Sequence, residues 1–171
     1  GNTAVVNALS TNGTALGTNS NIGANSNNSL AVGYNSIINA GDGCREHPTQ
    51  GLLDIFTVQE KLGSVKGRNI TIVGDVLHSR VARSNIFGFK KLGANVTVCG
   101  PSTLMPRCVK ELGVEVSYDL EASMKKSDCV IVLRLQKERQ QEVFLPSLRE
   151  YARLFGLSQS KLDKASKDLL I

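Results

Sequence analysis

Between Ile37 and Ile171, short runs of β-branched and apolar residues alternate with amphipathic stretches, and this alternation limits the fold more than any other feature of the chain. The apolar runs lie at 70–73, 96–99, 114–117 and 129–133, and each has the length of a buried strand. Strands that alternate with helices are typical of a parallel sheet. The sequence therefore predicts an α/β fold, an open doubly wound parallel sheet with helices on both faces.

Helices are expected between and after these strands. The stretch that follows Pro48 places Leu52, Ile55 and Phe56 on one face, and the stretch that follows Ser79 is amphipathic in the same way. A third helix is expected to begin at Asp119, because aspartate is a favourable N-cap and lysines follow in the last turn, where they complement the helix dipole. Two further helical stretches are expected at 145–155 and 158–170.

The composition changes sharply at Asp42, because residues 1–41 contain no Asp, Glu, Lys, Arg or His. From Thr14 to Ser36, small aliphatic residues recur before glycine at irregular spacing among Asn and Ser. Asn and Gly tolerate positive φ, so this pattern suits short strands joined by tight turns. A flexible polar leader is the alternative. The sequence thus predicts an uncharged leader over residues 1–36, rich in Asn, Ser and Gly, and a folded domain over residues 37–171.

Composition also disfavours several classes of function. The chain has 171 residues and a net charge of +5, but its basic residues are interleaved with acids, aromatic residues make up 5%, and tryptophan is absent. This pattern disfavours nucleic-acid binding. No apolar run approaches the roughly 20 residues that span a bilayer, so no membrane partner is expected. The four cysteines form no Cys-x-x-Cys pair, which favours a reducing cytoplasm.

Polar residues stand at the places where a doubly wound sheet gathers its ligands, just after the carboxyl ends of its strands. After the first strand, Gly74 and Asp75 lead to Arg80 at a helix start, where backbone N–H groups favour an anion and the guanidinium can hold a carboxylate. Before that strand, His47 and Gln50 are three residues apart and can both address one small planar carbonyl group.

A second polar cluster follows the last predicted strand. Arg134 emerges at the strand end, Gln136 follows on the same side if the chain stays extended, and Glu138 could orient a guanidinium. Two arginine forks and an amide match a dicarboxylate such as aspartate. The Gly-x-Gly-x-x-Gly fingerprint is missing, which disfavours a dinucleotide. Cys44 with His47 could form a nucleophile and base or a metal pair, but no further ligand or partner is evident in the sequence.

In their order and spacing, these segments resemble the aspartate carbamoyltransferases. The motifs that carry the resemblance are His47-Pro48-Thr49-Gln50, Gly74-Asp75 with His78-Ser79-Arg80, and Arg134-Leu135-Gln136-Lys137-Glu138-Arg139. The related ornithine enzymes usually have cysteine where Thr49 stands and bind a cationic side chain. The resemblance covers about residues 37–171, while residues 14–36 are similar to head repeats of trimeric autotransporter adhesins.

The resemblance implies transfer of the carbamoyl group from carbamoyl phosphate to the α-amine of L-aspartate, a step in pyrimidine biosynthesis, in a cytoplasmic homotrimer without metal or organic cofactor. His47 would hydrogen-bond the carbonyl oxygen, and Gln50 would hold the carbamoyl amide. The aspartate carboxylates would be bound by Arg80, Arg134 and Gln136, with Glu138 in support.

The chain also departs from the family pattern. The family has two domains, and its carbamoyl-phosphate domain carries a Ser-Thr-Arg-Thr loop, a further arginine and a lysine from a neighbouring subunit, none of which can lie in the uncharged residues 1–41. A His-Pro-x-Pro loop would follow Ile171, so the domain is expected to be truncated there. We therefore expect little turnover from the isolated chain, because a phosphate dianion needs cationic partners. The alternative is a non-catalytic module that binds an amino acid or serves at a surface or in oligomerisation.

Overall fold

In the computed structural model, the residues described are 5–6, 14–16, 21–22, 30–32, 37–38, 46–135 and 147–171. The chain divides into two compact units, residues 1–50 and residues 51–171. Three residues singled out in the sequence, Cys44, Gln136 and Glu138, lie outside the described residues.

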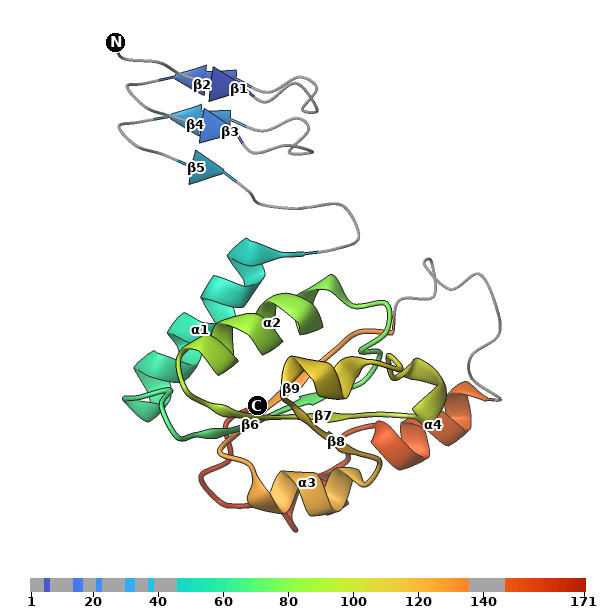
Figure 1. The fold of residues 1–171 in the computed structure, drawn as a ribbon. Helices are drawn as coiled ribbons and strands as arrows, with labels where there is room; N and C mark the ends of the chain where they lie inside the picture. The colour runs from blue at the N-terminus through green and yellow to red at the C-terminus, as the bar shows by residue number, and fades with distance from the viewer. Residues whose placement is uncertain are drawn as a thin grey trace. The chain divides into compact units, whose positions relative to one another are not determined.

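Within the described residues of the first unit, there are five short strands in two parallel sheets. They are β1 (Val5–Val6), β2 (Thr14–Leu16), β3 (Asn21–Ile22), β4 (Leu30–Val32) and β5 (Ile37–Ile38). One sheet has the order β1-β3-β5 and the other pairs β2 with β4 (Figure 1).

The strand partners in this unit lie sixteen residues apart, as in Val5 with Asn21 and Thr14 with Leu30. The spacing of the aliphatic residues, which looks irregular along the sequence, is therefore regular when strands of the same sheet are compared. Ala15 and Leu16 of β2 pair with Ala31 and Val32 of β4, whereas Asn21 and Ile22 of β3 belong to the other sheet.

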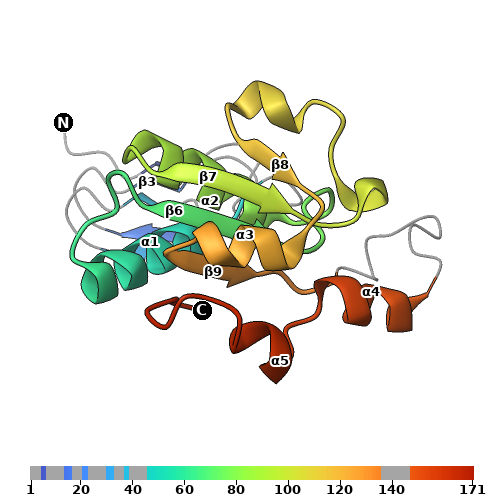
Figure 2. The same ribbon diagram turned by 90° about the horizontal axis from the view of Figure 1, so that it is seen from below.

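The second unit is built around a parallel sheet of four strands. Its strands are β6 (Asn69–Val73), β7 (Asn95–Cys99), β8 (Glu115–Ser117) and β9 (Cys129–Val132), in the order β8-β7-β6-β9. Its helices are α1 (Pro48–Leu62, which begins in the first unit), α2 (Arg80–Lys91), α3 (Leu120–Lys126), α4 (Leu148–Phe155) and α5 (Gln159–Leu162). Helices α1 and α2 lie over one face of the sheet, and α3 lies on the opposite side (Figures 1 and 2).

Alternation of side chains along the strands divides the core between the two faces of the sheet. On the face of α1 and α2, Ile70 and Ile72 of β6 pack with Phe89 of α2 in the larger cluster. On the other face, Val73 packs with Met124 of α3 and Phe155 of α4. The predicted fold class, an α/β parallel sheet with helices on both faces, is confirmed.

Three expectations about the helices need correction. Helix α1 turns Gly51, Val58 and part of Ile55 to the core, whereas Leu52 and Phe56 are 67% and 63% exposed. Of the three residues predicted to share the packed face, only Ile55 packs. Between β7 and β8, where a helix was expected to connect the strands, the chain forms two short 3-10 helices at Ser102–Leu104 and Val109–Leu112.

The helix expected at 158–170 is also shorter than predicted, because only Gln159–Leu162 is helical. Leu170 lies instead beside β9, where its N–H donates to Asp128 O (3.1 Å) and its carbonyl accepts from Val130 N–H (2.8 Å). These sheet-type bonds require an extended backbone at Leu170, which a continuing helix could not provide.

Candidate functional site

The carboxyl ends of β6 and β9 meet side by side, because these two strands are neighbours in the sheet. The pairing continues past the strands, with the Leu133 N–H donating to the Val73 carbonyl at 2.8 Å. Gly74 and Arg134 are the next residues on their respective strands. The structure therefore brings the turn that carries Arg80 and the segment that carries Arg134 to one edge of the sheet, as the sequence predicts.

The turn between β6 and α2 is held by a buried carboxylate. Asp75 is fully buried, and its Oδ1 accepts hydrogen bonds from the His78 backbone N–H (3.2 Å) and from the His78 ring at Nδ1 (2.8 Å). Ser79 then caps α2, since its Oγ accepts from the Ala82 N–H at 3.2 Å. Arg80 is consequently the first residue of a capped helix, half-buried and on a well-defined backbone.

Gly74 is at the closest approach of this turn to its neighbours. Its φ is +127°, and a Cβ at this position would lie 3.1 Å from the Leu133 Cβ, the Leu133 carbonyl and the Tyr151 hydroxyl of α4. Burial, and then the charge of Asp75, raise the pKa of Tyr151 to about 12, so the hydroxyl keeps its proton at neutral pH. Helix α4 thereby contributes a neutral phenol to the strand ends that precede Arg80 and Arg134.

His47 and Gln50 lie together at the start of α1. The Gln50 backbone N–H donates to His47 Nδ1 at 3.4 Å, and the Thr49 hydroxyl is 3.3 Å from the same nitrogen. His47 therefore occupies the N-cap position of α1, with Pro48 as the first helical residue. Because Nδ1 accepts a hydrogen bond, the proton of the neutral ring lies on Nε2, which is then a donor.

The predicted site residues thus form two groups. His47 and Gln50 share the start of α1 in the first unit, and Arg80 and Arg134 share the sheet edge in the second. Sequence reasoning assigned no role to Asp75 or His78, although their spacing within the turn was visible. It gave no signal for Tyr151, because this contact arises only from the packing of α4 on the sheet.

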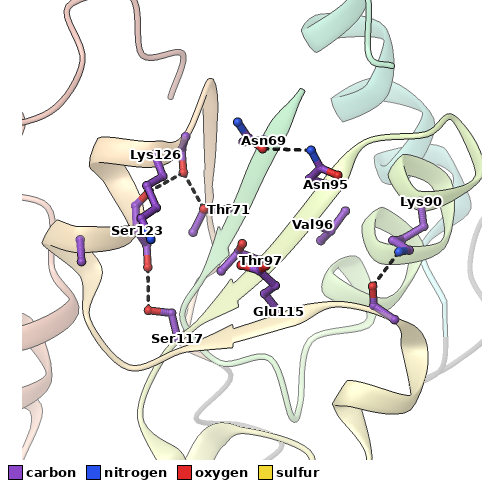
Figure 3. Close-up of a pocket in the computed structure, with 13 residues that line it drawn as sticks. Asn69, Thr71, Lys90, Asn95, Val96, Thr97, Glu115, Ser117, Ser123 and Lys126 are labelled. Atoms are coloured by element: carbon purple, nitrogen blue, oxygen red, sulfur yellow. Dashed lines mark hydrogen bonds between the residues drawn. The ribbon is translucent and has the colours of Figure 1, made fainter. Parts of the chain in front are cut away.

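A polar hollow of about 850 Å³ lies elsewhere, over the amino-terminal half of the sheet (Figure 3). Its amides and hydroxyls already bond to one another, as in Asn95 Nδ2 to Asn69 Oδ1 (3.1 Å) and Thr71 to Ser127 (2.6 Å between hydroxyl oxygens). The strands run from this hollow toward the edge that bears the arginines, so the hollow is separate from the candidate site.

The described part of the chain has neither a candidate metal centre nor a candidate membrane-spanning helix. There, no group of three or more His, Cys, Asp or Glu side chains is arranged to hold a metal ion. Among those same residues, no helix has both the length and the apolar character needed to cross a membrane.

The fold and the positions of the two arginines define a class of protein, namely a doubly wound α/β domain with basic side chains after the carboxyl ends of adjacent strands. Residues 66–171 match the family described as aspartate/ornithine carbamoyltransferase, Asp/Orn binding domain. The chain belongs to this family.

Similar proteins support this assignment. The chain is 57% identical over 136 residues to the aspartate carbamoyltransferase catalytic subunit of Gemmatimonas aurantiaca, a match that covers 80% of the chain and 43% of that relative. The corresponding subunit of Desulforamulus reducens is 55% identical over 136 residues, with coverage of 80% and 44%. The chain therefore spans less than half the length of these relatives.

A solved structure gives the same result. Aspartate transcarbamoylase from Trypanosoma cruzi, in complex with N-(phosphonacetyl)-L-aspartic acid, superposes with a TM-score of 0.66 and 31% identity, over 80% of this chain and 47% of that one. The same enzyme in complex with phosphate gives a TM-score of 0.64 and 32% identity, over 78% and 46%.

Proposed function

We propose that this chain supplies the aspartate-binding part of an aspartate carbamoyltransferase, which transfers the carbamoyl group of carbamoyl phosphate to the amine of L-aspartate. The products are N-carbamoyl-L-aspartate and phosphate. The observation that carries the proposal is the presence of Arg80 and Arg134 after adjacent strand ends. Two guanidinium forks at one sheet edge suit a substrate with two carboxylates.

Each site residue has a role in this proposal. Arg80, Arg134 and Gln136 bind the aspartate carboxylates, and Glu138 supports them. His47 donates from Nε2 to the carbamoyl oxygen and stabilises the charge that develops there, while Gln50 holds the carbamoyl amide. The hydrogen bond from the Gln50 N–H to His47 Nδ1 supports this assignment, because it leaves the proton of the neutral ring on Nε2.

The complete enzyme needs more than residues 37–171, which we regard as the aspartate-binding domain behind a leader at 1–36. We propose that the assembled protein is a cytoplasmic homotrimer that binds carbamoyl phosphate through groups from outside this chain. Residues 1–41 offer no cation for the phosphate. We therefore expect little or no phosphate release from the chain alone, and a rate typical of enzymes in a phosphate-release assay would contradict that expectation.

Titration of the chain with succinate, an unreactive mimic of aspartate, tests the binding proposal by calorimetry. We expect saturable binding that Arg134→Ala and Arg80→Ala each weaken roughly tenfold or more, because each removes charge-assisted hydrogen bonds. Arg107→Ala, at an exposed position outside the site, is the matched control and should bind like the unmodified chain. Equal affinity for all four proteins would refute the proposed site.

The short parallel strands of the first unit favour a second candidate function, a non-catalytic module used at a surface or in oligomerisation. Sedimentation of the chain with and without succinate separates the two. Oligomers that form without any succinate binding would favour the module over the enzyme part.

A further inference from the structure

Helices α1 and α2 approach each other closely along a seam that begins near the start of α1. A Cβ on Gly51 would lie 3.1 Å from the Ser84 Cβ, and a methyl group on Gly88 of α2 would require the end of the Ile55 side chain to move. Both glycines therefore allow a short distance between the helices. The glycines themselves, however, carry no side chain that could bond across the seam.

One polar pair in this seam can prevent sliding. Asn85 is fully buried, and its Nδ2 donates to the Asp54 Oδ2 at 2.6 Å. The other amide atom, Asn85 Oδ1, is buried and has no hydrogen-bond partner within the part of the chain that the structure describes. The amide thus uses its donor side to bind the other helix, while its acceptor side stays unsatisfied.

The energy balance of this pair argues for a role other than stability. A hydrogen bond to a charged group contributes about 1.5–3 kcal/mol, and a buried unsatisfied acceptor costs about 1–3 kcal/mol. The two effects nearly cancel. The pair therefore adds little to stability, but its hydrogen bond depends on geometry. A bond of 2.6 Å between the Asn85 amide and the Asp54 carboxylate can form in only one register of α1 on α2.

That register matters because both helices begin with predicted site residues. Gln50 directly precedes Gly51 in the first turn of α1, and Arg80 opens α2 five residues before Asn85, about 7.5 Å along the helix axis. A slip of α1 along α2 would move the start of one helix relative to the other. Displacements near 1 Å in a substrate site can reduce rate or affinity a hundredfold.

We propose that Asp54 and Asn85 are positioning residues that hold the starts of α1 and α2 in the register required for substrate binding. The assignment of what they position rests on the proposed function. Neither residue touches substrate in this scheme, and both act through the helices that carry Gln50 and Arg80.

A swap of the two side chains tests the proposal. Asn85→Asp places two carboxylates against each other, which should displace α2 and Arg80 at its start and weaken succinate binding at least tenfold. Asp54→Asn keeps an acceptor for the Asn85 amide and should change succinate binding less than threefold. The double variant Asp54→Asn/Asn85→Asp restores the bond with donor and acceptor exchanged and should return to within threefold of the unmodified chain. Glu60→Gln, an exposed acid-to-amide change in α1, is the control.

A second measurement keeps the test independent of substrate. In NMR spectra of the 15N-labelled chain, Asn85→Asp should displace the backbone amide resonances of Gln50 and Arg80, and the double variant should restore them. Restored resonances without succinate binding by any variant would refute the proposed function and leave the positioning role intact. A folded Asn85→Asp variant with unshifted resonances, or a folded double variant that does not recover them, would overturn the positioning role.

Discussion

Replacement of Gly74 by alanine tests whether the sheet edge that carries the arginines depends on close packing. Gly74 has a φ of +127°, and alanine in such a conformation costs about 1–3 kcal/mol. The added methyl group would also lie 3.1 Å from two atoms of Leu133 and from the Tyr151 hydroxyl, an overpacking that costs about 1–3 kcal/mol. We expect Gly74→Ala to lower the free energy of unfolding by about 3 kcal/mol in total.

Gly63→Ala separates the two contributions. Gly63 follows α1 with a φ of +74°, but nothing lies within 4 Å of its added methyl group, so only the backbone cost of about 1–2 kcal/mol applies. Urea denaturation followed by circular dichroism measures both variants. Tyr151→Phe in the Gly74→Ala background removes one of the close atoms and should recover part of the loss. The reasoning is refuted if Gly74→Ala destabilises the chain no more than Gly63→Ala does.

Two further predictions concern stability. Lys161 Nζ donates to three carbonyls at the end of α4, at 2.8, 2.9 and 2.9 Å, so Lys161→Met should lower the free energy of unfolding in urea by about 2 kcal/mol. Lys164→Met, which removes only an exposed ion pair to Glu121, should lower it by less than about 1 kcal/mol, and equal effects would contradict the capping role. Burial raises the pKa of Cys129 from 9.0 to about 11. Between pH 9 and 11, this thiol therefore loses its proton in the unfolded chain but keeps it in the folded chain. Stability should therefore fall as pH rises from 9 to 11, by roughly 2–3 kcal/mol for this thiol, and urea titrations of Cys129→Ala across that range should show a shallower fall.

The sequence is informative about the sheet because its strands are short, β-branched and separated by amphipathic stretches. The rule that ligands gather at the carboxyl ends of strands then brought Arg80 and Arg134 together without knowledge of the strand order. Hydrophobic periodicity was less reliable for α1, where Leu52 and Phe56 are exposed and the seam is made through Gly51. A glycine adds nothing to a hydrophobic pattern, so a helix that packs through glycine is assigned the wrong face.

The features that the sequence did not predict arise from contacts between segments that are distant in the chain. The helix expected at 158–170 is confined to Gln159–Leu162, and Leu170 pairs with β9 instead of continuing it. Local propensity carries no information about that distant pairing. Tyr151 reaches Gly74 through the packing of α4, which no spacing in the sequence encodes. His47 shows the reverse case, because a histidine followed by proline at a helix start already indicates the capping geometry that the structure contains.

The sixteen-residue register of the first unit restricts how its length can change. Because successive side chains of a strand point to opposite sides, a one-residue shift of β1 along β3 would exchange the two sides of β1. Loss or gain of sixteen residues would instead remove or add one pair of strands and leave the next pair in register. Length changes of whole multiples of sixteen residues are therefore the ones expected to keep every strand pairing of this unit.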